Sequence, residues 1–316
     1  MKEKIYRMRG KPMKKILIFG GTGFIGTQLI KKLKAEGNYL ILATRKKNTE
    51  NEKVNIIDEI VEYREDEYTA LKEITSIDVI INLAGESIIG LRWTKEKKKR
   101  ILESRLKVIK VIEAFVKESG NKVPLLIQAS AAGFYGYSDD DIAVNEDSPS
   151  GEGFLAETCK VLEKQVLSLN GYFNRIAIVR FGIVIGNGGF VIQVLRGFKF
   201  KVGVSIGTGR NWFSWIHVQD VVKGISFIIE KEELKGAINF VAKESIRFAE
   251  FIRIFARIKN TSIIINIPSF VCKLALGEMA DMLTKGISIE SKKLIESGYE
   301  YEFVNVEEAL LDILQK

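Results

Sequence analysis

The spacing of apolar residues changes abruptly near the start of the chain. Ile16 to Phe19 form a short unbroken apolar run, the pattern of a strand buried on both faces. From Phe24 to Leu33 apolar residues recur at helical spacing, and four glycines lie between Phe19 and Thr27. This order predicts a strand, a tight turn and a helix, and the rest of the chain can be aligned on that unit.

Further strands and helices alternate through the first three quarters of the chain, which predicts an α/β fold with a doubly wound parallel sheet. The expected strands are Tyr39–Arg45, Ile56–Tyr63, Asp78–Gly85, Leu125–Ala129, Ile176–Arg180 and Ile238–Val241, and the expected helices are Ile101–Phe115, Phe154–Leu169 and Val218–Ile229. The glycine-rich segments 186–189 and 203–209 are expected to be loops.

The pattern also suggests how the chain divides. Residues 1–12 are basic and precede the first strand, so they are interpreted as a leader extension. Residues 13–243 form the nucleotide-binding domain, with an excursion toward the substrate side at about 187–213. Residues 244–316 hold short helical segments and one apolar strand at Ile263–Ile265, which predicts a smaller substrate-side lobe.

The glycines follow the spacing Gly20-x-x-Gly23-x-x-Gly26, each with a separate expected role. One allows a tight turn, Gly23 allows backbone amides to approach a pyrophosphate, and Gly26 allows the helix to pack closely on the strand. The N-terminus of the helix then faces the anion. An ordinary glycine turn at a strand–helix junction is the alternative, because this spacing alone is a weak signal.

The end of the second predicted strand indicates which dinucleotide is preferred. An NAD enzyme tends to place an acidic residue there for the ribose 2′-hydroxyl, whereas this chain has Thr44, Arg45 and two lysines. Cationic side chains suit a 2′-phosphate, so the predicted cofactor is NADP(H), with Arg45 as its main contact. An exposed basic loop is the alternative.

Composition excludes several other classes. The 316 residues are 46% hydrophobic and 28% charged, with a net charge of +8, and no apolar run is long enough to predict a membrane span. Much of the positive charge lies in local runs such as Lys95–Arg100, without the interleaved aromatic residues of a nucleic-acid surface. Two isolated cysteines and one histidine argue for a reducing compartment, predicted to be the cytoplasm, and against a metal site.

Together these motifs resemble the extended short-chain dehydrogenase/reductases, the NAD(P)-dependent epimerase/dehydratase group, and within it the atypical branch named short-chain dehydrogenase family 39U. The resemblance rests on Gly20–Gly26, Ala84–Ile88, Ser130–Gly136, Glu103–Leu106, Arg180–Gly186, Asn211–Asp220 and Leu276–Asp281. It implies NADP(H) binding. The predicted cofactor-binding residues are Gly20, Thr22, Gly23, Phe24, Ile25, Gly26, Thr44, Arg45, Leu83, Ala84, Gly85 and Arg105. The contact of Arg105 is implied by the resemblance alone, since the pattern by itself makes it a helix residue facing solvent.

The resemblance fails at the expected catalytic residues. Typical members use a serine, a tyrosine and a lysine four residues after the tyrosine, whereas here Leu155 and Cys159 occupy the last two positions. Tyr135, Ser130 and Cys159 are the candidate replacements. Each has a plain alternative: packing in a loop for Tyr135, a helix or turn cap for Ser130, and inert packing for Cys159.

Four residues are candidate substrate contacts. Glu86 follows a strand end where a carboxylate could act near the nicotinamide, although a solvated loop is the alternative. Arg210, Trp212 and Trp215 could bind an anionic or ring-bearing substrate, although tryptophans more often fill a core. His217 could be a general acid or base, but in this type of segment the histidine more often orders the loop.

The sequence therefore predicts an NADP(H)-dependent oxidoreductase or epimerase-like enzyme for a small carbonyl or sugar-like substrate. A non-catalytic NADP(H)-binding sensor or partner-docking protein is the alternative, because the tyrosine–lysine pair is missing. A nucleic-acid binder rests only on net charge, so neither nucleic acid nor a membrane is an expected partner. Relatives dimerise through helices that flank the sheet, which leaves a homodimer open.

Overall fold

A central parallel sheet organises the protein, as the sequence predicted. The structure is a computed structural model and describes residues 12–45, 56–64, 71, 74, 76–89, 92–120, 122–137, 141–198 and 202–315. Within that part the strands of the sheet lie in the order β11-β6-β5-β4-β1-β2-β3, and every neighbouring pair is parallel. Their bounds are β1 Lys15–Phe19, β2 Tyr39–Thr44, β3 Glu59–Glu62, β4 Val79–Asn82, β5 Val123–Ala131, β6 Phe173–Phe181 and β11 Gly236–Phe240.

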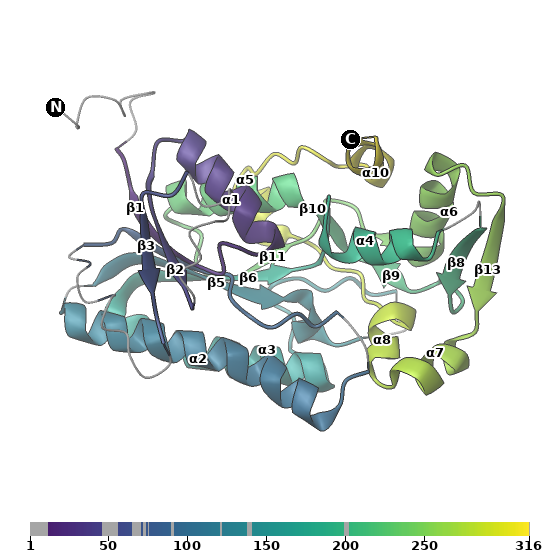
Figure 1. Cartoon of the computed structure of the whole chain (residues 1–316), viewed down its shortest axis with the longest axis horizontal. Helices are drawn as coiled ribbons and strands as arrows, with labels where there is room; N and C mark the ends of the chain where they lie inside the picture. Colours follow the sequence, from purple (N-terminus) through teal and green to yellow (C-terminus); the bar gives the residue numbers. More distant parts are fainter. Residues whose placement is uncertain are drawn as a thin grey trace.

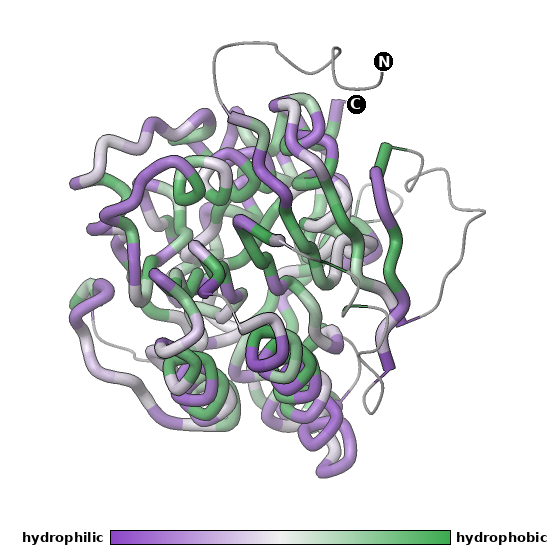
Figure 2. The backbone as a smooth tube through the Cα atoms, turned by 90° about the vertical axis from the view of Figure 1, so that its left-hand side faces the viewer, coloured by the Kyte–Doolittle hydropathy of each residue, from purple (hydrophilic) through white to green (hydrophobic). Residues whose placement is uncertain are grey.

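Helices cover both faces of this sheet (Figure 1). On one side lie α1 (Phe24–Ala35) and α5 (Val218–Glu230), and on the other lie α2 (Lys95–Ser119) and α3 (Phe154–Leu167). Figure 2 shows that the strands are mostly hydrophobic and that the helices are amphipathic, with their polar residues facing outward. The doubly wound fold is confirmed.

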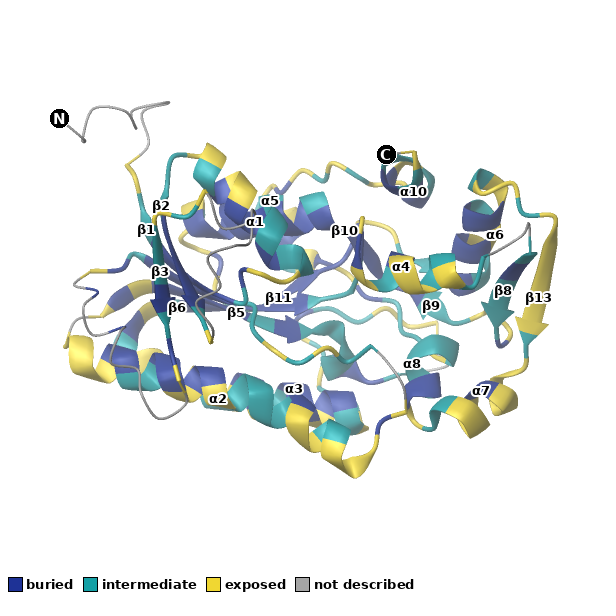
Figure 3. Cartoon of the chain, viewed as in Figure 1, coloured by how far each residue is buried: buried dark blue, intermediate teal, exposed yellow. Residues whose placement is uncertain are grey.

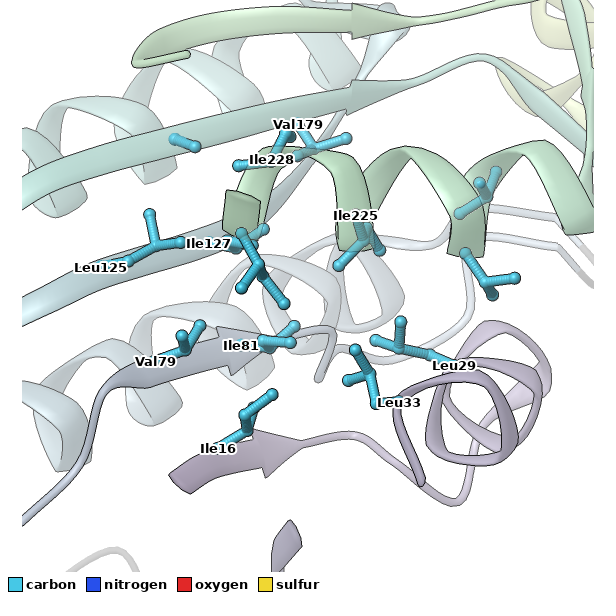
Figure 4. Close-up of a cluster of buried hydrophobic side chains, with 14 of the residues drawn as sticks. Ile16, Leu29, Leu33, Val79, Ile81, Leu125, Ile127, Val179, Ile225 and Ile228 are labelled. Atoms are coloured by element: carbon cyan, nitrogen blue, oxygen red, sulfur yellow. The ribbon is translucent and has the colours of Figure 1, made fainter. Parts of the chain in front are cut away.

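Burial on both faces explains the unbroken apolar run of β1. Ile16 and Ile18 pack with Leu29 and Leu33 of α1, while Leu17 and Phe19 belong to the cluster under α2 and α3. Figure 4 shows side chains of the first cluster meeting between β1, β4 and β5 on one side and α1 and α5 on the other. This packing fixes where the strand ends and where the glycine turn begins.

A second lobe follows the sixth strand of the sheet in the chain. It contains β7 (Ile183–Ile185), α4 (Gly189–Arg196), β8 (Val202–Ile206), β9 (Trp212–Phe213), β10 (Trp215–His217), β12 (Ile246–Arg247), α6 (Phe248–Ile258), β13 (Ile263–Ile267), α7 (Ser269–Leu276), α8 (Met279–Thr284) and α10 (Val306–Leu314). Its core is aromatic, with Phe213, Phe251 and Phe255 buried beside Trp215.

One predicted loop of this lobe is wrong. Gly203 to Ile206 belong to β8, which pairs in parallel with β13 about 60 residues later. The predicted apolar strand at Ile263–Ile265 is confirmed within β13. The first four residues of β13 are exposed and Ile267 is half-buried (Figure 3), so this short pair lies at the rim of the lobe.

The chain leaves the second lobe and returns to the sheet before it ends. Helix α9 (Lys292–Glu296) packs against β11, and Tyr299 is buried in the cluster beneath α5. The Tyr299 hydroxyl donates to the Asp220 backbone oxygen at 2.9 Å. The chain then crosses back to form α10.

A short 3-10 helix, η3 (Ala132–Tyr135), follows β5, and a second, η4 (Asn170–Tyr172), precedes β6.

Candidate cofactor and active site

The glycine turn between β1 and α1 has the geometry of a nucleotide loop. Gly20 has a φ of +76°, and a Cβ there would lie 2.7 Å from the Leu83 carbonyl carbon and from the Ala84 amide nitrogen. A Cβ on Gly26 would lie 2.4 Å from the Gly20 oxygen. The turn therefore rests directly on the segment after β4, and α1 begins directly on the turn.

The N-terminus of α1 is open to an anion. Its N-cap residue, Gly23, makes no side-chain hydrogen bond, and the first turn of the helix has no acidic residue. Thr22 and Gly23 are exposed, whereas Lys32 and Lys34 lie in the last turn. An uncapped, dipole-positive end with free access fits the pyrophosphate of a dinucleotide.

The ends of the neighbouring strands extend this surface in two directions. On the β2 side, Thr44 is half-buried and Arg45 is exposed, while the two lysines that follow lie outside the described residues. On the β4 side, Leu83 and Ala84 are half-buried. The sheet order thus separates a basic end over β2 from an apolar end over β4 and β5.

Arg105 reaches that second end from α2. Its Nη1 donates to the Glu86 and Ile101 backbone oxygens at 3.1 and 2.8 Å, and its guanidinium lies against Gly85. Burial lowers the pKa of Arg105. The expectation that this side chain faces solvent is wrong, because the loop after β4 folds over it.

Glu86 is already engaged by α2. Its Oε1 accepts from Lys97 Nζ at 2.6 Å and from Arg100 Nε at 3.3 Å, and these bonds, chiefly that from Lys97, lower the pKa of Glu86. Its amide donates to Ser104 Oγ. The residue ties the loop to the helix, and its role toward a substrate stays a prediction.

A buried polar network lies beneath the ends of β5, β6 and β11. Arg180 and Glu163 form a two-bond ion pair, Nε to Oε1 at 3.0 Å and Nη2 to Oε2 at 2.8 Å. The Ser130 hydroxyl donates to Glu163 Oε1 at 2.7 Å, and Arg180 Nη1 donates to the Tyr135 hydroxyl at 2.8 Å. That hydroxyl donates to Asn239 Oδ1 at 2.7 Å. We define these five residues as the Glu163–Arg180 network.

This network corrects the expected position of Tyr135. The side chain is only 4% exposed, and its hydroxyl is engaged on both sides, so it is not a phenol open to the crevice. Burial is the main cause that raises the pKa of Tyr135, partly offset by Arg180. Ser130 is also buried and bonded. Both residues are held structurally in this conformation, and their catalytic roles stay untested.

Cys159 is equally enclosed. It is 5% exposed, its Sγ donates to the Ala131 oxygen at 3.7 Å, and burial raises the pKa of its thiol. A protonated, inaccessible thiol lacks the properties of a nucleophile. The structure thus favours the packing alternative for this residue. Cys272 is also a free buried cysteine.

Two of the predicted substrate residues line one cavity and a third does not. Arg210 and Trp212 border a cavity of about 690 Å³ in the second lobe, with Arg247, Arg253, Asp141 and Glu250. The Arg247 guanidinium lies 3.6 Å from the centre of the Trp212 ring. Trp215 is 0% exposed in the core of the lobe, so the expected substrate contact there is wrong.

His217 orders the chain rather than facing a ligand. It is 1% exposed, its Nδ1 accepts from the Gln219 amide at 3.2 Å at the start of α5, and its ring packs on Phe303.

Among the described residues, no cluster of His, Cys, Asp and Glu is arranged to hold a metal, and none of the helices could span a membrane.

The sheet, the glycine turn and the added lobe define a Rossmann-type dinucleotide-binding protein of the extended short-chain dehydrogenase type. A model described as the NAD dependent epimerase/dehydratase family matches residues 16–240, and a domain of unknown function (DUF1731) matches residues 267–313. The chain belongs to this family, in the branch of the epimerase family protein SDR39U1, and the resemblance drawn from its motifs is confirmed.

Individual relatives agree. The epimerase family protein YfhF of Bacillus subtilis (strain 168) is 34% identical, covering 95% of this chain and 97% of the relative. The chloroplastic SDR39U1 homolog of Arabidopsis thaliana is 32% identical over 95% of this chain and 86% of its own length. The human SDR39U1 (isoform 2) structure with NADPH has a TM-score of 0.84 and 28% identity, covering 96% of this chain and 99% of that one.

Proposed function

We propose that the protein is an NADP(H)-binding oxidoreductase or epimerase-like enzyme for a small carbonyl or sugar-like substrate. The main supporting observation is the glycine turn, held against Leu83 and Ala84 and leading into an uncapped helix end. When bound, a reduced nicotinamide supplies a hydride to a carbonyl carbon. The chain's own residues bind the cofactor and orient its two halves along the carboxyl edge of the sheet.

The preference for the phosphorylated cofactor rests on Arg45. It is exposed at the end of β2, next to the strand that carries the glycine turn. A guanidinium in that place can pair with a 2′-phosphate through two hydrogen bonds. The human relative whose structure contains NADPH supports the same preference.

The substrate side is proposed to include the cavity beside Arg210 and Trp212. Three arginines against two carboxylates line it. Such a wall suits an anionic ligand.

Calorimetry with NADPH, NADH and their oxidised forms tests this proposal. We expect NADPH to bind more tightly than NADH, and Arg45→Ala to weaken NADPH roughly 10- to 100-fold, the loss of one charge-assisted interaction. NADH affinity should stay the same. Arg196→Ala, an exposed change on α4, is the matched control. Absence of binding to all four forms would reject the proposal, and equal affinity for NADH and NADPH would reject the role of Arg45 alone.

A second candidate is a non-catalytic NADP(H)-binding sensor or partner-docking protein. It is supported by the burial of Ser130, Tyr135 and Cys159, which leaves none of the three as an open acid or base. Oxidation of NADPH by any member of a carbonyl panel would exclude this candidate. The cytoplasmic location and a homodimer stay predictions, to be checked by fractionation and by light scattering.

A further inference from the structure

A group of exposed apolar side chains lies at one end of the second lobe. It begins on β13 and continues, past Pro268, onto α7 (Figure 3). Single exposed apolar residues are normal on a protein surface, whereas a large group of them marks an interaction site. The six large apolar residues of this group are between 40% and 80% exposed, and we define them as the β13–α7 strip: Ile263, Ile264, Ile265, Phe270, Val271 and Leu274.

The part of the strip on α7 forms one face of that helix. Leu274 lies three residues after Val271 and four after Phe270, so the three side chains are neighbours on the helix surface. Cys272, on the opposite side, is the buried residue of α7. The helix therefore packs on its own lobe through one side and presents an apolar face to solvent on the other.

Strand β13 has an open edge. It pairs with β8 on one side, and in the part of the chain that the structure describes no strand pairs with its other side. Side chains of a strand alternate between two faces, yet residues 263–266 are all exposed, so neither face is covered. No charged residue occurs between Asn260 and Cys272, in a chain that is 28% charged. The charges that commonly protect an edge strand from pairing are thus missing.

The strand is suited to pairing with a second copy of itself. Its five residues are centred on Ile265. An antiparallel pairing with a two-fold axis at that residue places Ile263 of one copy opposite Ile267 of the other and leaves no residue of the strand unpaired. The same pairing brings α7 of each copy, which follows the end of β13, toward the start of its partner's β13. Both parts of the strip then belong to one contact.

The area of the strip matches the needs of such a contact. The exposed fractions of its six residues equal those of about three and a half fully exposed residues, or roughly 600 Å² at about 150–200 Å² each. A standard interface buries about 800 Å² on each partner, and about 65% of a homodimer interface is apolar. The strip alone therefore supplies the apolar part of a two-fold interface.

The long helix that flanks the sheet is less suited to this role. None of the large apolar side chains of α2 is exposed, and its exposed positions are almost all lysine, arginine or glutamate. A two-fold contact brings the same patch of both copies together, so a contact through α2 would place its lysines near one another. This repulsion is absent from the uncharged edge of β13.

We propose that the β13–α7 strip is the interface of a homodimer, in which two β13 strands pair antiparallel about Ile265. The contact joins the two β8–β13 pairs into one four-stranded sheet and covers the apolar face of each α7. It uses the second lobe alone, so it does not depend on the cofactor proposed for the first.

Sedimentation velocity of the full chain, from about 1 to about 100 µM, measures the dimer directly. Ile265→Lys places a charge at the axis and enters the interface twice, so self-association should weaken at least roughly tenfold. Leu274→Glu should do the same from α7, at a position too exposed to disturb the fold. Val161→Lys, at an exposed valine on α3, is the matched control and should leave the dimer intact. Far-UV circular dichroism should be unchanged in all three variants.

A cysteine at the axis tests the pairing itself. In an antiparallel pair, residues directly opposite each other have Cα atoms roughly 4.5–5.5 Å apart, which is within the range of a disulfide. Ile265→Cys should therefore form a covalent dimer on mild oxidation and release it on reduction. Val161→Cys should stay a monomer on the same non-reducing gel. Both native cysteines are buried, so they should contribute little background.

Four results would overturn the proposal. They are a monomer at about 100 µM, a dimer that Val161→Lys breaks and Ile265→Lys does not, the absence of a disulfide in Ile265→Cys, and a monomer that binds anionic phospholipid vesicles through the strip. The third result would refute the pairing about Ile265, and the fourth would make a membrane surface the occupant. None of these measurements involves NADPH, so the proposed function is tested separately.

Discussion

Replacing Glu163 with alanine would leave the Arg180 guanidinium buried without its counter-charge. Arg180 and Glu163 have side chains only 5% and 8% exposed, and two short hydrogen bonds join them. Removing one partner of such a pair typically costs about 3–5 kcal/mol, because the remaining charge stays desolvated. Ser130 also loses its acceptor in the variant, so we expect the upper part of that range.

Urea unfolding measures the free energy directly, and a thermal scan gives a second estimate. At about 2 °C per kcal/mol for a chain of this size, the Tm should fall by roughly 6–10 °C. A double variant, Glu163→Ala with Arg180→Met, should be less destabilised than the sum of the single changes, because neither charge is then left alone. A loss below about 1 kcal/mol for Glu163→Ala, or strict additivity, would refute the view that this pair is a coupled buried unit.

Two further predictions follow from close packing and from burial. Gly26→Ala should abolish NADPH binding and destabilise the fold, because the new Cβ would lie 2.4 Å from the Gly20 oxygen; Gly171→Ala, with no heavy atom within 4 Å of the added Cβ, is its control in calorimetry and thermal melts. Burial raises the pKa of Cys159, so the unfolded chain ionises first, and stability should fall as the pH rises above about 9. Cys159→Ala should lessen that fall in pH-dependent urea melts, and an unchanged slope would contradict the assignment.

The sheet and the cofactor turn could be predicted because they are local in sequence. Strand β1, the glycine turn and α1 lie within 21 consecutive residues, and their apolar spacing and glycines carry the whole signal. The cationic end of β2 is likewise local. These features need no knowledge of distant contacts, which is why the family could be assigned from motifs.

The polar interior could not be predicted, because its partners are far apart along the chain. The Tyr135 hydroxyl meets Arg180 and Asn239, which lie 45 and 104 residues away, so the sequence left the side chain apparently free for chemistry. β8 was missed because its partner, β13, lies about 60 residues further on.

Because α9 returns to pack on β11, the folding of the first lobe depends on a segment that follows the second lobe in the chain. A chain cut after the last strand of the sheet would lack the segment that covers that strand, and Asp220 would lose Tyr299. The first lobe is therefore completed only after residues 292–299 have left the ribosome. Gene fragments that encode the nucleotide-binding part alone should therefore yield insoluble product. No single cut in the sequence separates the two lobes, so fusions and circular permutations should keep α9 together with the first lobe.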